Sequence, residues 1–171
     1  QKAQLNLSKR NMNKFLTKLI ILFFLLTNQT ISEENIMILK LKDGDVKIEL
    51  FEDVAPKHVK RIKELANSGK YNNVVFHRVI DGFMAQTGDV KFGNSSSSDF
   101  DLRRAGMGGS ELPDLQQEFS SLPHDRGTLS MARSSDPNSA NSQFFICFES
   151  ASYLDRNCLL YTSPSPRDVE E

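Results

Sequence analysis

Hydrophobic and polar residues alternate in two short runs near the start of the globular part of the chain. In the second run, Val46, Ile48 and Leu50 occupy every other position, and the residues between them are charged. Side chains of a β-strand point to opposite faces in turn, so this alternation predicts a strand with one buried face. The runs at residues 36–42 and 45–51 flank an Asp-Gly pair, which favours a tight turn. We therefore predict a β-hairpin.

The pattern then changes to one that is typical of a helix. Val59, Ile62 and Leu65 recur at a spacing of three, which brings them onto one face of an α-helix. Pro56 suits the first turn, where its missing N–H costs nothing, and the Ser-Gly pair that follows favours a stop. These signals predict one helix over residues 56–67.

Strand-like runs return further along the chain. They lie at residues 74–80, 83–86, 128–132 and 143–148. Residues 87–126 form a polar segment with little periodicity, and a connection of this length is usually functional or disordered. Short strands with one helix predict a mainly β fold, either a barrel or a sandwich.

Composition narrows the classes of function. The chain is 39% hydrophobic and 25% charged, as in an ordinary globular protein, and its 171 residues have room for one core. A formal net charge of -1 gives no reason to expect a nucleic-acid partner. The 2 cysteines and 3 histidines lack the spacing of metal ligands, so we expect no disulfide, no metal site and no cofactor.

The N-terminal region has the order of a targeting signal. A short basic region at residues 12–18 precedes an apolar run at 19–26 and a polar stretch at 27–34, as in a secretory signal peptide. Its apolar core of about ten residues is half of the about 20 that span a bilayer, so we favour cleavage over a membrane anchor. We predict that residues 1–32 are upstream sequence plus signal peptide, cleaved after Ser32. The protein would then be exported to a periplasm, a secretory pathway or the cell exterior.

One charged residue interrupts an apolar run. Arg78 falls within a predicted strand, on the face of Phe76 and Ile80 and opposite His77 and Val79. A guanidinium in that position must reach water or find polar partners. Position alone leaves two interpretations open, an arginine that extends to the surface and an arginine that serves a site.

Two blocks of sequence carry a resemblance to a known family. The first comprises residues 76–80, 82–84, Gln86 and 88–89, and the second comprises residues 130–132, 137–138 and 142–146. In this order they resemble the two signatures of the cyclophilin-type peptidyl-prolyl cis/trans isomerases, and the likeness extends from the first hairpin through Asp155. The resemblance implies a mainly β fold, a cyclophilin-like antiparallel β-barrel with one retained helix that lacks its last two strands and second helix. The incomplete domain would cover residues 33–157.

The resemblance also implies roles for individual residues. Arg78 matches the family's catalytic arginine. The residues that match the proline pocket are Phe83, Met84, Phe145 and Leu154, those that match contacts to the substrate backbone are Gln86 and Ala132, and Gln143 matches a residue beside the arginine. Without the family, Phe83, Met84 and Phe145 read as plain core. Tyr153 completes the substrate-binding set at a position where the family often has a tryptophan, which implies weaker binding of cyclosporin-like ligands that use an indole donor.

The implied function is a prolyl isomerase that accelerates X-Pro isomerisation during the folding of exported proteins. Its partners would be proline-containing peptides and unfolded client proteins, and it would act as a monomer without a stable membrane anchor. Two other interpretations stay open. The chain can be a peptide-binding chaperone module with little turnover, or an inactive fragment.

The C-terminal residues depart from the family. After Asp155 the family continues with a glycine, a strand, a helix and a closing strand, and these do not follow here. Residues 158–168 instead resemble a translated sequencing adapter. We therefore expect residues 158–171 to be a non-native tail, and the loss of two strands to leave the barrel open.

Overall fold

The computed structural model describes residues 35–155 and 159–160. The chain divides after Asn35, and the fold concerns the part that follows. The predicted signal peptide within residues 1–32 lies outside the described residues, and so does the predicted tail at 158–171 apart from Leu159 and Leu160. Both assignments stay predictions.

The predicted hairpin is confirmed. Strands β1 (Ile36–Leu41) and β2 (Gly44–Glu49) pair antiparallel around the expected turn. Met37 pairs with Ile48, and these inward-facing residues contribute to the core while most of the hairpin's other side chains remain exposed. Alternation along the second run therefore buries Ile48 and Leu50 as predicted, but Val46, which was predicted on the same buried face, is 41% exposed near the turn of the hairpin.

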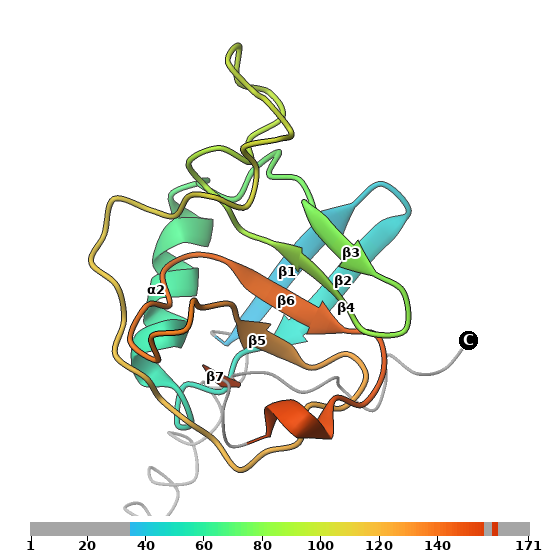
Figure 1. Cartoon of the computed structure of the whole chain (residues 1–171), viewed down its shortest axis with the longest axis vertical. Coiled ribbons are helices and arrows are strands. Elements are labelled where there is room, and N and C mark those ends of the chain that lie inside the picture. Colours follow the sequence, from blue (N-terminus) through green and yellow to red (C-terminus); the bar gives the residue numbers. More distant parts are fainter. Residues whose placement is uncertain (1–34, 156–158, 161–171) are drawn as a thin grey trace, which may run out of the picture. The chain divides into compact units, whose positions relative to one another are not determined.

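The remaining strands form a second, five-stranded antiparallel sheet (Figure 1). Its order is β3 (Arg78–Ile80), β4 (Met84–Thr87), β6 (Phe144–Cys147), β5 (Leu129–Met131) and β7 (Leu159–Leu160). A 3-10 helix, η1 (Ser152–Leu154), follows β6. The mainly β class is confirmed, and in the described part of the chain the hairpin and the sheet do not close into one barrel.

The helix α2 (Pro56–Asn67) has the predicted bounds. Val59 and Ile62 are fully buried, which accounts for the helical spacing of apolar residues in the sequence. Its first turn is capped from a distance, because the Glu118 carboxylate accepts the backbone N–H groups of Lys57 and His58 at 3.1 Å. The carboxylate thus satisfies donors that a helix N-terminus leaves without intrahelical partners.

Two apolar clusters lie on the two faces of β6. Phe144 packs in the larger cluster with residues of the hairpin and of α2, whereas Phe145 and Cys147 pack in a smaller cluster with Met84 and Ala151. Consecutive strand residues face opposite sides, so one strand supplies both the core and a second, separate surface. That second surface carries the candidate site.

The strand predicted over residues 74–80 was too long. Regular pairing begins only at Arg78, and Val74 makes an isolated bridge to Asn94. The backbone N–H of Val75 donates to Gly93 at 2.9 Å, and its carbonyl accepts the Thr87 hydroxyl at 2.9 Å. A loop carbonyl and a side-chain hydroxyl therefore satisfy this backbone, and no backbone ladder with a neighbouring strand forms here.

No helix in the described part of the chain is long and apolar enough to cross a membrane. Among the same residues, no group of three or more histidine, cysteine or acidic side chains is arranged to hold a metal ion. Cys147 is buried, at 1% exposed.

Candidate active site

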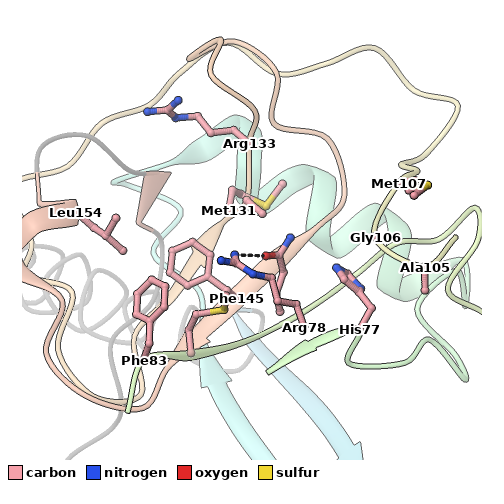
Figure 2. Close-up of a pocket in the computed structure, with 13 residues that line it drawn as sticks. His77, Arg78, Phe83, Ala105, Gly106, Met107, Met131, Arg133, Phe145 and Leu154 are labelled. Atoms are coloured by element: carbon pink, nitrogen blue, oxygen red, sulfur yellow. Dashed lines mark hydrogen bonds between the residues drawn. The ribbon is translucent and has the colours of Figure 1, made fainter. Parts of the chain in front are cut away.

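A cavity of about 630 Å³ opens on the outer face of the five-stranded sheet (Figure 2). Residues from β3, β4, β5 and β6 meet there with residues of the long polar segment and of η1. The lining residues are His77, Arg78, Phe83, Met84, Gln86, Ala105, Gly106, Met107, Met131, Ala132, Arg133, Phe145 and Leu154. In Figure 2, Arg78 and His77 lie on one side of the cavity, and Phe83 and Leu154 lie on the other.

Arg78 stands at the polar side, on the edge strand β3. It pairs in register with Gln86 of β4, so the two side chains project from the same face of the sheet. Its guanidinium donates a hydrogen bond from Nη1 to Gln86 Oε1 at 3.3 Å. The side chain is both exposed and partnered, and Figure 2 shows its charged end beside the ring of Phe145. Arg78 thus reaches the surface and also lines the cavity, and its role there stays a prediction.

A second amide extends the polar side. Gln86 donates from Nε2 to Gln143 Oε1 at 2.9 Å. Gln143 in turn donates from its Nε2 to the carbonyl oxygens of Gly106 at 2.9 Å and Gly108 at 2.7 Å. Arg78 is therefore the first member of a hydrogen-bonded series that ends in the long polar segment.

The apolar side consists of Phe83, Met84, Phe145 and Leu154. Met84 is 1% exposed and Phe145 is 8% exposed, and both belong to the smaller apolar cluster, against which Phe83 and Leu154 pack. Gln86 and Phe145 are paired neighbours on β4 and β6. An apolar pocket thus lies directly beside a charged donor, within one strand spacing.

His77 closes the cavity beside the glycine-containing loop. A Cβ on Gly106 would lie 2.6 Å from His77 Cδ2, so only glycine allows this approach of the loop. Burial lowers the pKa of His77, and the carboxylate of Asp89 opposes this shift only in part. The imidazole is therefore neutral at neutral pH.

Behind the apolar wall lies a buried histidine that sequence reasoning missed. The ring of His124 stacks on Phe145 at 6.4 Å between centroids, and its Nδ1 lies 2.9 Å from Asp155 Oδ1. Its Nε2 lies 3.3 Å from Ser130 Oγ, so Ser130, His124 and Asp155 are linked in the same order as the serine, histidine and aspartate of a hydrolytic triad. Ser130 is 0% exposed, so no substrate can reach its hydroxyl, and the group supports the pocket wall instead.

Most of the predicted site residues surround one cavity. Arg78, Phe83, Met84, Gln86, Ala132, Phe145 and Leu154 line it. Gln143 lines an adjoining polar cavity of about 530 Å³ that shares Gln86 and Ala132 with the first. Tyr153 lines neither cavity; it is 67% exposed, and its ring lies 5.8 Å from that of Phe83. The individual roles of these residues stay predictions.

Lining residues outside the predicted set of site residues are His77, Ala105, Gly106, Met107, Met131 and Arg133. His77 could have been found, because it directly precedes Arg78 in the first signature block. Arg133 points away from Arg78 in Figure 2, and its Nη1 donates to the carbonyl of Ser134 at 2.8 Å. This second arginine is therefore oriented toward its own loop.

Comparison with known proteins agrees with this arrangement. Residues 36–162 match the family model described as cyclophilin type peptidyl-prolyl cis-trans isomerase/CLD. A probable peptidyl-prolyl cis-trans isomerase of Brucella suis is 63% identical over 122 residues, which cover 71% of this chain and 62% of that protein. Peptidyl-prolyl cis-trans isomerase B of Escherichia coli is 39% identical over 103 residues, 60% of this chain and 56% of the relative. The chain thus spans less than two thirds of these relatives.

Solved structures give the same answer. A cyclophilin from Hirschia baltica superposes with a TM-score of 0.64 at 26% identity, covering 80% of this chain and 66% of the other. A cyclophilin type isomerase from Cryptosporidium parvum, crystallised in the presence of the dipeptide Ala-Pro, gives a TM-score of 0.60 at 34% identity, with 72% and 74% covered. The chain belongs to the family of cyclophilin-type peptidyl-prolyl cis-trans isomerases.

Proposed function

We propose that the protein catalyses cis-trans isomerisation of X-Pro peptide bonds in the cavity described above. The barrier to rotation, about 18–20 kcal/mol, arises from the partial double-bond character of the C–N bond. When the amide twists, the lone pair of the prolyl nitrogen is released from resonance and becomes a hydrogen-bond acceptor. A donor aimed at that nitrogen binds the twisted state more strongly than either planar state, which is the requirement for catalysis.

The observation that carries the proposal is the position of Arg78 beside an apolar pocket. Phe83, Met84, Phe145 and Leu154 offer a dry surface for a proline ring. Gln86 holds one nitrogen of the guanidinium, and the remaining N–H groups stay available to a peptide in the cavity. No nucleophile or cofactor is needed for this reaction, since no covalent bond breaks.

The test is an isomerisation assay on a short X-Pro peptide with the full chain and with Arg78→Ala. We expect the substitution to lower kcat/KM by about a hundredfold, as the loss of a transition-state donor does elsewhere. Arg104→Ala is the matched control, because Arg104 lies over the ring of Phe92, outside the cavity. Activity of Arg78→Ala within a factor of about two of the original chain would refute the assignment. Peptide binding without turnover would support the chaperone-module alternative.

We further propose that the protein is exported and assists the folding of exported client proteins. The proposal is supported by the basic, apolar and polar order of residues 12–34. Expression of the full chain in a bacterium, followed by N-terminal sequencing of the protein recovered outside the cytoplasm, should give a mature form that begins at Glu33. Recovery of only the uncleaved chain from the cytoplasm would contradict export.

We also propose weak binding of cyclosporin-like ligands. Tyr153 lies beside Phe83 at the rim of the site and supplies no indole N–H donor. Tyr153→Trp should therefore strengthen competitive inhibition about fivefold, the equivalent of one hydrogen bond of about 1 kcal/mol. Tyr153→Phe serves as the control, and equal inhibition of all three proteins would contradict the proposal.

A further inference from the structure

Behind the cavity lies a carboxylate that has no direct part in the proposed reaction. Asp89 is 0% exposed. Its Oδ1 accepts the backbone N–H groups of Lys91 at 3.0 Å and Phe92 at 2.9 Å, and its Oδ2 accepts those of Gly106 at 2.8 Å and Gly108 at 2.9 Å. A buried charge is costly unless it is hydrogen-bonded, and bonds to a charged acceptor are stronger than neutral ones. Asp89 therefore ties the glycine-containing loop firmly to the turn that follows β4.

The same two glycines are the end of the series that begins at Arg78. Their carbonyl groups only accept hydrogen bonds, so the NH₂ group of Gln143 must face the loop and its oxygen must face Gln86. Gln86 must then present its own oxygen to the guanidinium. Every donor in the series points from the arginine toward the buried carboxylate. The two glycines of the loop therefore connect the series that begins at Arg78 to the carboxylate of Asp89.

We propose that Asp89 is a positioning residue for Arg78. The carboxylate fixes the loop, the loop fixes the orientation of the Gln143 and Gln86 amides, and these amides fix the direction of the guanidinium. This inference rests on the proposed isomerase function. The competing explanation is that Asp89 only stabilises the loop, which predicts lower stability and unchanged turnover per folded molecule.

The first test is Asp89→Asn, which keeps the size of the side chain and replaces one acceptor oxygen by an NH₂ group. The NH₂ group faces backbone N–H donors and cannot accept from them, so two of the four hydrogen bonds that Asp89 accepts are lost. We expect kcat to fall about tenfold while KM stays within about twofold, because the peptide still binds but the donor is misaligned. Glu118→Gln is the matched control: it weakens the carboxylate that caps α2, away from the cavity, and should lower stability without changing kcat.

A double-mutant cycle tests the route of the effect. When Gln143→Met has already interrupted the series, adding Asp89→Asn should change kcat by less than about twofold. If Asp89→Asn does not fold, Gly108→Ala decides, because its Cβ would lie 2.8 Å from Asp89 Oδ1 and displace the loop while leaving the charge in place. The proposal is overturned if folded Asp89→Asn or folded Gly108→Ala keeps kcat within about twofold of the original. It is also overturned if the effects of Asp89→Asn and Gln143→Met on kcat are fully additive.

A spectroscopic readout separates this inference from the proposed function. In ¹H–¹⁵N spectra, Asp89→Asn should shift the side-chain amide signals of Gln86 and Gln143, whereas Glu118→Gln should leave both in place. If the unmodified chain does not isomerise X-Pro peptides, the proposed function fails and these shifts still decide the positioning role. Unshifted amide signals in Asp89→Asn overturn it.

Discussion

Phe145 and Phe144 offer a direct test of the division between pocket and core. They are consecutive on β6 and face opposite sides: Phe145 lines the cavity, and Phe144 packs edge-on against Tyr71 in the larger cluster. Both are well buried, at 8% and 2% exposed. Alanine at either position should lower the free energy of unfolding by about 3–5 kcal/mol. Only Phe145→Ala should also weaken substrate binding.

The size of the binding effect follows from the proline ring. Its three methylene groups contribute about 0.8 kcal/mol each when buried, or about 2.4 kcal/mol together. Phe145 is one of the four side chains on the apolar side of the cavity, and we expect its loss to remove up to half of this contact, about 1.2 kcal/mol. Because 1.4 kcal/mol corresponds to a factor of ten, KM should rise about sevenfold.

The assay is the dependence of the isomerisation rate on peptide concentration, measured at low temperature to keep both variants folded. Partial unfolding would raise the apparent KM by the inverse of the folded fraction, so both variants are assayed under conditions where their urea unfolding curves show them fully folded. We expect Phe144→Ala to keep the original KM. The reasoning is refuted if KM of Phe145→Ala stays within about twofold of the original, or if both variants raise KM equally.

Two further predictions concern stability. Gly88→Ala should lower the free energy of unfolding by about 2–5 kcal/mol, because φ of Gly88 is +89° and a Cβ would lie 2.5 Å from the carbonyl oxygen of Ser142. The control is Gly82→Ala, which should cost only about 1–2 kcal/mol, because φ of Gly82 is +67° and no atom lies nearer than 4.0 Å to the added Cβ. Equal losses of stability in urea unfolding would contradict the close contact at Gly88. Stability should also fall as pH drops from about 7.5 to about 5.5, because burial lowers the pKa of His58 and His77 in the folded state, whereas the unfolded chain takes up these protons below about pH 6.5. His77→Asn should make the free energy of unfolding from urea titrations depend less on pH. An unchanged pH dependence would contradict a lowered pKa of His77 in the folded state.

Elements with strong local signals could be predicted from the sequence. The helix over Pro56–Asn67 has a proline at its start, apolar residues at helical spacing and a stop, and its observed bounds match. The hairpin has clear alternation around Asp-Gly. Residues 74–77 carry strand-like composition as well, yet Val75 bonds to the backbone of Gly93 and to the side-chain hydroxyl of Thr87, and does not join a backbone ladder with a neighbouring strand. The amino-acid composition of a segment indicates that it is half-buried, but it does not indicate which other segment packs against it.

The resemblance located the predicted site residues on the strands and directly beside them, whereas the path of the long segment could not be predicted. Strand register brings Arg78 next to Gln86, and Gln86 next to Phe145. Met107 reaches the cavity, and His124 stacks behind Phe145, because distant side chains fix the path of the chain through this segment. Sequence reasoning had no periodicity to follow there, and only the glycines indicated where the backbone comes close to other groups.

The path of that segment also depends on the helix. Arg61 of α2 is 7% exposed, and it donates to the carbonyl oxygens of Pro113 at 2.7 Å and Asn141 at 3.2 Å. Asn141 in turn accepts the Ser110 N–H at 2.7 Å and donates to the Leu112 carbonyl at 3.0 Å. The polar side of the site is thus held by non-local bonds from buried side chains, whereas the apolar side is held by strand alternation and packing. Changes to the first group should therefore act mainly on kcat by misdirecting Arg78, and changes to the second mainly on KM by loosening the proline pocket.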